Sequence, residues 1–158
     1  MNFKYHLPLL FLLTVFISNV SYSQSNRRTE RVNVINYGNT INKPLTQQEL
    51  AMINEAYGDK AQSNILSKPQ RVKDIKHILR NRIEIKSIPN KRDQKPCTLL
   101  SEVPLMDYYV SDLERESNFN PQNFNPLKYL FEFYSTGTHM YQVDNTNYFI
   151  IIKSQLNN

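Results

Sequence analysis

The spacing of apolar and polar residues predicts a first helix from Gln47 to Tyr57. Apolar side chains recur at helical spacing at Leu50, Ile53 and Tyr57. Thr46 and Glu49 have the spacing of a capping box, in which each side chain bonds a backbone N–H at the start of the helix. Gly58 follows the last apolar position, where a glycine commonly ends a helix.

A second helix is predicted from about Lys68 to Asn81, because Pro69 suits a first helical turn and an apolar stripe follows it. The stripe consists of Val72, Ile75, Leu79 and Ile83. Basic residues flank the stripe at Lys73, Arg80, Arg71 and Arg82, and His77 lies on the far side of the helix. Long basic side chains in such positions usually lay their stems on the rim of the core, so we expect their charges to be exposed.

Alternation of apolar and polar residues predicts strands, mainly in the C-terminal part of the chain. The expected strands there are Lys128–Tyr134, His139–Val143 and Tyr148–Lys153, which would form a three-stranded antiparallel meander. Shorter alternating runs at Val32–Tyr37 and from Ile83 onward predict two further strands.

The segment Tyr148–Ile152 is apolar on both of its faces. An antiparallel strand with one solvated face alternates, so this run predicts a strand that is covered twice. The helices of the first half are the expected cover. Without that cover, the strand would be offered to another chain by strand addition.

Two connections stand out by composition. Residues 89–96 are bounded by prolines and rich in charge, which predicts an exposed loop. Residues 118–126 contain Asn-Phe-Asn-Pro twice, which predicts two tight turns that project Phe119 and Phe124. These rings either anchor the turns to the core or are displayed to a partner.

Together these elements predict an α+β fold, with two amphipathic helices packed on a small, mainly antiparallel sheet. The chain has 158 residues, enough for one domain with a real core, and we assign residues 32–158 to it. The single Cys97 cannot form an internal disulfide, so the fold does not depend on one.

The N-terminal 23 residues have the pattern of a secretory signal peptide. Lys4 precedes an apolar run from Leu7 to Ile17 that is too short to span a membrane, and small residues precede the junction after Ser23. Residues 24–31 are polar and charged, as in a flexible tail. We therefore expect an exported protein, periplasmic or secreted, whose mature chain has no membrane span.

Charge is distributed unevenly along the chain. Residues 24–96 contain 15 lysines and arginines against 7 acids, whereas residues 97–158 contain 3 against 7. An exported protein meets little nucleic acid, so the basic half is expected to face an anionic envelope polymer, a partner protein or its own acidic half.

Candidate chemistry is sparse. Residues 144–147 read Asp-Asn-Thr-Asn, but the glycine and the later glutamate of a calcium loop are missing, so we interpret them as a hairpin corner and expect no metal. With 3 glycines, neither a phosphate loop nor a dinucleotide turn can be written, and no cofactor is expected. Cys97 or Ser101 with His139 could form a nucleophile and base, but such combinations arise by chance. Glu114 and Glu116 lie in a polar stretch, which favours a solvated face over an acid and base pair.

One combination of residues resembles a known group of proteins. Residues 124–129 (Phe-Asn-Pro-Leu-Lys-Tyr), followed by Tyr141-x-Val143-Asp144-Asn145-Thr146-x-Tyr148, are similar to a segment of small exported proteins of Gram-negative bacteria whose function is unassigned. The similarity extends back through residues 78–82. The resemblance implies an envelope or secreted setting and supplies no activity, cofactor or catalytic residue.

These observations favour a non-catalytic accessory protein that binds another envelope or secreted protein. The expected contact residues are Phe119, Phe124, Tyr148, Ile150 and Ile152. An alternative is a binder of an anionic polymer or glycan that uses Lys73, Lys76, Arg80 and Arg82. A small hydrolase is a third hypothesis, and the oligomeric state stays open.

Overall fold

The computed structural model describes Ile35 and residues 37–156, which all belong to one compact unit, Asn33–Asn158. The predictions of a signal peptide, a flexible tail and most of a strand at 32–37 concern residues outside the described part. Within the described part the chain contains helices and one four-stranded, mainly antiparallel sheet, so the predicted α+β class is confirmed.

The first long helix, α2, spans Gln47–Tyr57, as predicted. Both bonds of its capping box form, because the Thr46 side chain accepts from the Glu49 N–H and the Glu49 carboxylate accepts from the Thr46 N–H. Gly58 ends the helix with a φ of 49°, a left-handed value that favours glycine.

The second helix, α3, spans Pro69–His77 and continues as a π-helical turn over Ile78–Arg82, in agreement with the predicted range. Between the two helices the chain forms a short 3-10 helix at Gly58–Lys60 and a π-helical turn at Gln62–Leu66, neither of which was predicted. Further 3-10 turns occur at Asn39–Asn42, Lys91–Asp93, Leu100–Glu102 and Pro126–Lys128.

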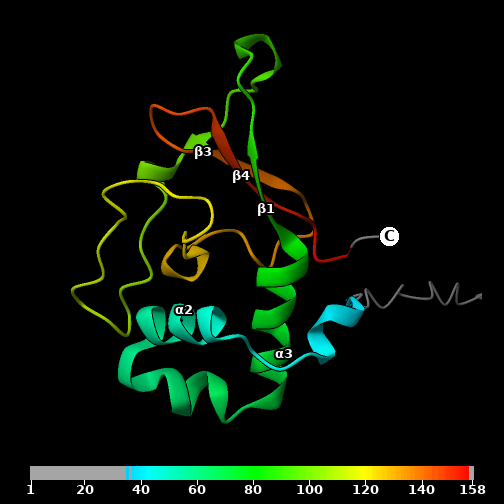
Figure 1. Ribbon diagram of the computed structural model, residues 1–158, viewed down its shortest axis with the longest axis vertical. Helices are drawn as coiled ribbons and strands as arrows, with labels where there is room; N and C mark the ends of the chain where they lie inside the picture. Colours follow the sequence, from blue (N-terminus) through cyan, green and yellow to red (C-terminus); the bar gives the residue numbers. More distant parts are fainter. Residues whose placement is uncertain (1–34, 36, 157–158) are drawn as a thin grey trace, which may run out of the picture. The chain divides into compact units, whose positions relative to one another are not determined.

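The sheet has the strand order β1-β4-β3-β2 (Figure 1). Its strands are β1 at Ile83–Ser87, β2 at Thr98–Leu99, β3 at His139–Gln142 and β4 at Tyr148–Ile152. β4 pairs antiparallel with β3 and with β1, and β2 joins β3 in parallel. β4 is therefore an inner strand, and β1 is an edge strand.

The predicted strand at Lys128–Tyr134 is wrong, although side chains in this segment do alternate between the core and the surface. The Asn125 side chain accepts from the Leu127 N–H, and this cap with Pro126 winds the chain into a 3-10 turn. Beyond the turn, Tyr129 forms a single bridge with Leu105, and the chain does not join the sheet. The third antiparallel strand beside the β3–β4 hairpin is β1, which pairs with β4.

The buried apolar residues form two clusters. One is helical and is built around Ile53, Ile65 and Ile75. The other covers one face of the sheet, where Ile150 and Ile152 pack with an aromatic segment that we define as residues 124–133. The aromatic segment contributes Phe124, Tyr129, Phe131 and Phe133 to the sheet cluster and Leu127 to the helical cluster. On this face the aromatic segment, rather than the expected helices, is the main cover of β4. Phe149, on the other face, is also fully buried, so β4 is covered on both faces at this point, as predicted.

The two predicted loops also have definite conformations. Residues 89–96 are exposed apart from Gln94, whose side chain donates to the Ile88 carbonyl and to Asn147. In residues 118–126, a first turn closes from Asn120 to Asn123 and a second begins at Asn125. Phe124 is buried and Phe119 packs against it, so both rings anchor the turns to the core.

Candidate functional site

Three of the five residues predicted to contact a partner are in the core. Phe124, Ile150 and Ile152 are at most 3% exposed, so none of them can meet another molecule in the folded chain. β4 lies between β1 and β3, which satisfies both of its edges. The idea of β4 as a free, sticky strand is therefore wrong. Phe119 and Tyr148 are half-buried and lie in contact, with ring centroids 5.5 Å apart.

Two of the four basic residues proposed for polymer binding are engaged within the chain. Arg82 is 2% exposed and donates to the carbonyl oxygens of Phe133 and Lys153. Arg80 pairs with Glu49, with Nε 2.5 Å from Oε1, and also donates to backbone carbonyls in residues 40–44. Their charges are not exposed as expected, because the chain before α2 packs against Arg80, whereas carbonyls in the C-terminal part of the chain accept from Arg82.

The remaining residues on this side of α3 are also covered. The Lys73 ammonium lies 4.0 Å from the centroid of the Tyr37 ring, and Lys76 donates to the Ile41 carbonyl. His77 is buried, and its Nε2 has no hydrogen-bond partner among the described residues. Burial and the nearby charge of Arg82 lower the pKa of His77.

A cleft of about 480 Å³ lies beside the β3–β4 turn, and we call it the turn cleft. One wall is the turn itself, residues 143–146, together with Leu100 and Ser101, and the other wall is residues 115–119 with Tyr129. It therefore brings together several residues that the sequence singled out separately: Ser101, Glu116, Phe119 and Asp144.

The turn wall is held by backbone-directed hydrogen bonds. Asn145 has a φ of 55°, and Thr146 bonds the Val143 carbonyl through both its N–H and its hydroxyl. The interpretation of these residues as a hairpin corner is confirmed. Asp144 accepts from the Ser101 N–H and hydroxyl, and these bonds outweigh burial and hold the pKa of Asp144 below its ordinary value.

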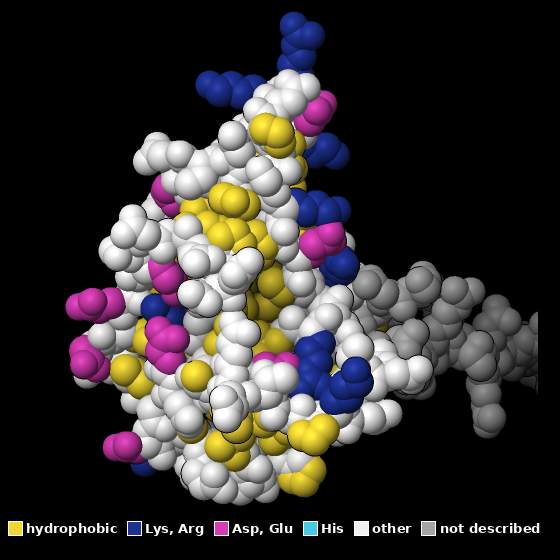
Figure 2. Space-filling view, in the orientation of Figure 1, with side chains coloured by type: hydrophobic (Ala, Val, Ile, Leu, Met, Phe, Trp, Pro, Cys, Tyr) yellow, Lys and Arg dark blue, Asp and Glu magenta, His cyan; other side chains and the backbone are white. Residues whose placement is uncertain are grey.

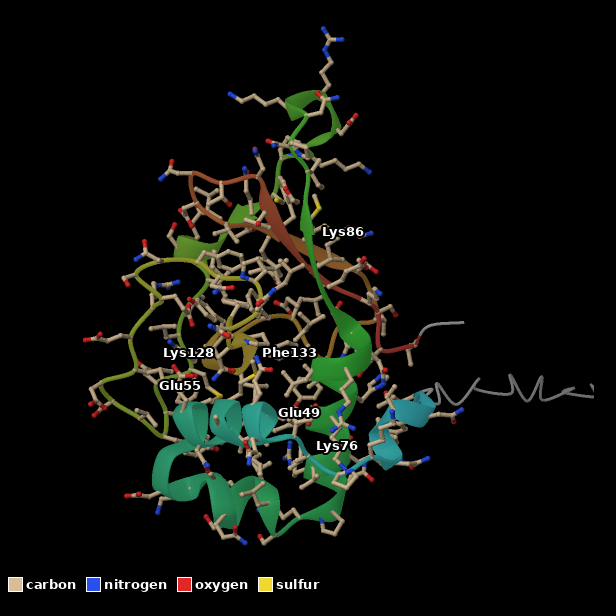
Figure 3. The ribbon with its side chains drawn as sticks, viewed as in Figure 1. Glu49, Glu55, Lys76, Lys86, Lys128 and Phe133 are labelled. Atoms are coloured by element: carbon tan, nitrogen blue, oxygen red, sulfur yellow. The ribbon has the colours of Figure 1, made fainter. Side chains whose placement is uncertain are left out.

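The opposite wall is built on a buried lysine. Lys128 Nζ lies 3.0 Å from the carboxylates of both Glu116 and Glu55, and Figure 3 shows Lys128 beside Glu55 of α2. Burial lowers the pKa of Lys128, but the two carboxylates outweigh it and raise the pKa above its ordinary value. Glu116 also accepts from the Tyr129 hydroxyl, whose pKa is raised by burial and by that carboxylate.

Arg115 completes this wall and was not singled out by the sequence analysis. Its guanidinium donates to the Leu100 and Val103 carbonyls and lies 5.5 Å from the centroid of the Tyr129 ring. The scarcity of basic residues in this half of the sequence could have drawn attention to Arg115. The acidic half has only three basic residues, and Arg115, Lys128 and Lys153 all make internal polar contacts.

The charged groups of the turn cleft are thus already engaged with one another or with the backbone. The groups left at its rim are neutral amides and hydroxyls, at Ser117, Asn118 and Asn145, around the Phe119 and Tyr129 rings. Such a cleft can accept a side chain or a small polar molecule by shape and hydrogen bonding.

The nucleophile and base combinations considered from the sequence do not assemble in the part of the chain that the structure describes. Ser101 donates to Asp144, while His139 bonds Ser135. Cys97 is half-buried, and burial raises the pKa of its thiol, which disfavours the reactive thiolate. Among residues 37–156, no three His, Cys, Asp or Glu side chains are grouped so that they could hold a metal ion.

Comparison with protein families, curated proteins and solved structures found no match to this chain. No helix in the described residues is long and apolar enough to cross a membrane.

Proposed function

We propose that this chain is a non-catalytic, exported binding protein of the bacterial envelope, and that the turn cleft is its contact surface for another protein. The observation that carries the proposal is an open cleft of about 480 Å³ whose charged groups are already satisfied internally. A pre-formed cleft of this kind loses little entropy when it binds, and the remaining amides and hydroxyls give direction to the contact.

The setting is proposed from the N-terminal pattern of the sequence and from the resemblance to small exported proteins. Periplasm and medium are both compatible with that pattern. The partner is an envelope or secreted protein that inserts a side chain or loop between the β3–β4 turn and residues 115–119. Phe119 and Tyr148, two of the five contact residues expected from the sequence, remain half-buried beside this surface.

A glycan is the second candidate ligand, and it would use the same cleft. Neutral amides and hydroxyls around aromatic rings suit sugar hydroxyls as well as a peptide. The basic side of α3 has less support as a polymer site than its sequence pattern suggested, because Arg80 and Arg82 are engaged internally.

The test uses a matched pair of variants. Asn118 lies at the cleft rim and Asn54 on the exposed side of α2, and neither side chain forms a described hydrogen bond. The mature protein and the Asn118→Arg and Asn54→Arg variants are crosslinked to the native envelope fraction, and the retained protein is identified, purified and titrated by calorimetry.

We expect Asn118→Arg to weaken that binding at least about tenfold, a loss of about 1.4 kcal/mol, and Asn54→Arg to leave it unchanged. Equal affinity for both variants would place the contact elsewhere and contradict the proposal. Binding of peptidoglycan fragments with the same Asn118 dependence, without any retained protein, would replace the protein partner by a glycan.

A further inference from the structure

The outer edge of β1 has backbone groups that no described residue pairs with. The Ile88 N–H bonds the Asn147 carbonyl and the Lys153 N–H bonds the Arg82 carbonyl, so even-numbered residues of this strand point their backbone groups at β4. The odd-numbered residues Ile83, Ile85 and Ser87 therefore point theirs away. The Ile83 N–H donates to the Ile78 carbonyl, and the others lack a partner among residues 37–156.

This edge also adjoins apolar surface. A second cleft of about 430 Å³ runs beside it. Its lining includes the apolar side chains of Ile83, Ile85, Met52 and Leu79 and the polar side chains of Thr46, Gln48, Glu49 and Gln122. Figure 2 shows hydrophobic side chains along the centre of this face, with charged side chains beside them. An open edge next to apolar surface is a template for a further strand.

The charges of β1 identify the strand that fits. Glu84 and Lys86 lie on the opposite face from Ile85, and their side chains pair with each other at 2.9 Å. Figure 3 shows Lys86 on the outer side of the strand. A strand that alternates an acid and a base around a central apolar residue is complementary to an antiparallel copy of itself.

We propose that β1 pairs with β1 of a second copy of this chain, antiparallel, about a twofold axis at Ile85. Because only the odd-numbered residues direct their backbone groups outward, the registers nearest to this one place the twofold axis at Glu84, Ile85 or Lys86. An axis at Glu84 would face two glutamates and an axis at Lys86 two lysines, and like charges directly opposite are destabilising. Only the axis at Ile85 sets Glu84 opposite Lys86 of the second copy.

In this register each Ile85 N–H donates to the Ile85 carbonyl of the other copy, and each Ser87 N–H to the Ile83 carbonyl of the other copy. The sheet becomes continuous through both subunits, and the two Ile85 side chains meet beside this second cleft. The dimer goes beyond the proposed function and does not depend on it. The second cleft, beside β1, and the turn cleft share no lining residue, so pairing through β1 would leave both turn clefts open. A dimer could therefore bind a surface through two turn clefts at once, which would raise its affinity for that surface.

The test is sedimentation equilibrium of the mature protein and of two charge variants, Glu84→Lys and Lys86→Glu. Each variant alone sets like charges opposite one another, so its dimer dissociation constant should rise at least about tenfold over wild type. An equimolar mixture restores opposite charges at every pair, so a mixed dimer should form with affinity close to wild type. That rescue also shows that both variants fold.

A wild-type protein that stays monomeric across the concentration series would overturn the proposal. Variants that dimerise as strongly as wild type, or a mixture that stays monomeric, would overturn it equally, because the register predicts the opposite in each case.

Discussion

At the scale of single residues, the charges that the chain buries are its most constraining feature. Lys128 and Arg82 are at most 5% exposed, and each finds acceptors from distant parts of the chain. Desolvating a charge costs several kcal/mol unless it is paired and hydrogen-bonded, so these residues fix how segments meet rather than serving a ligand.

Lys128 gives the first prediction. Lys128→Met would leave the mostly buried Glu116 without its cation, and we expect the free energy of unfolding to fall by about 3 kcal/mol. Glu55→Gln is the control, because the Glu55 side chain is 49% exposed and its loss should cost only about 0–1 kcal/mol. Urea denaturation of both variants measures the difference. Equal losses would show that burial does not govern this network.

Glu49 gives a prediction on pH. The pKa of Glu49 lies below its ordinary value of 4.5, and the largest cause is the hydrogen bonding that its carboxylate accepts from Arg80. A carboxylate with a depressed pKa stabilises the folded state above its unfolded pKa, and that contribution is lost as pH falls through the folded pKa. We therefore expect the stability of wild type to decline below pH 4.5 and its advantage over Glu49→Gln to shrink in parallel.

Thermal unfolding from pH 7 downward measures the difference in stability between wild type and Glu49→Gln. Glu114→Gln, at an exposed position, serves as the control. A wild-type advantage over Glu49→Gln that stayed constant with pH would contradict the role assigned to the Arg80 pair.

Residue patterns could predict which side chains of α3 flank its apolar stripe, but not what lies over them. The exposure of Arg80 and Lys73 depends on residues 37–44, which lie 36 to 40 positions earlier in the sequence and contact these two side chains through backbone carbonyls and the Tyr37 ring. Periodicity contains no signal for a segment that packs through carbonyls, so the burial of this basic side could not be foreseen.

At the scale of elements, local signals predicted more than non-local ones. The bounds of α2 follow from its capping box and from Gly58, all within the helix or next to it. The alternation in residues 128–134 gave the correct inward rings, but it could not show that Asn125 and Pro126 start a 3-10 turn first. Strand pairing joins β1 to β4 across more than half the described chain, and no local pattern specifies it.

The turn cleft was foreseen only in parts for the same reason. The hairpin corner at residues 144–147 could be predicted from Asn and Asp turn chemistry. Its opposite wall comes from Arg115 and Glu116, which sequence alone read as a solvated stretch, because the contacts with Leu100 and Tyr129 arise only on folding.

β4 provides the element-scale prediction, because adjacent residues sit in different surroundings. Ile150 is fully buried against the aromatic segment, whereas Ile151 is half-buried on the other face of the sheet. We expect Ile150→Ala to lower the free energy of unfolding by about 2–5 kcal/mol and Ile151→Ala by about 1 kcal/mol. Chemical denaturation tests this, and comparable losses at both positions would contradict the assigned facing.

At the scale of the whole molecule, the opposite charges of the two halves do not dock them as expected. The ion pairs that join the halves run the other way, from lysines of the acidic half to acids of the basic half, as Lys128 to Glu55 and Lys153 to Glu84. Arg82, in the basic half, reaches backbone carbonyls of the acidic half. The excess of basic residues is therefore left for other contacts, and Lys91, Arg92 and Lys95 are exposed in the loop at residues 89–96.

Separate surfaces of the molecule have separate tasks in this proposal. The aromatic segment joins the helical and sheet clusters, the outer edge of β1 is proposed for self-association, and the turn cleft is proposed for a partner. Binding at the turn cleft should therefore survive the charge variants of β1, although a bivalent contribution to affinity would be lost with the dimer.

Position-specific photo-crosslinking in living cells that produce the full chain tests whether the turn cleft binds another protein. A photoreactive amino acid replaces Asn118 at the rim of the turn cleft or, as the matched control, Asn54 on α2. We expect a discrete product with one envelope or secreted protein from position 118 and none from position 54. The same product from both positions, or from position 54 alone, would contradict the assignment of the turn cleft as the contact surface.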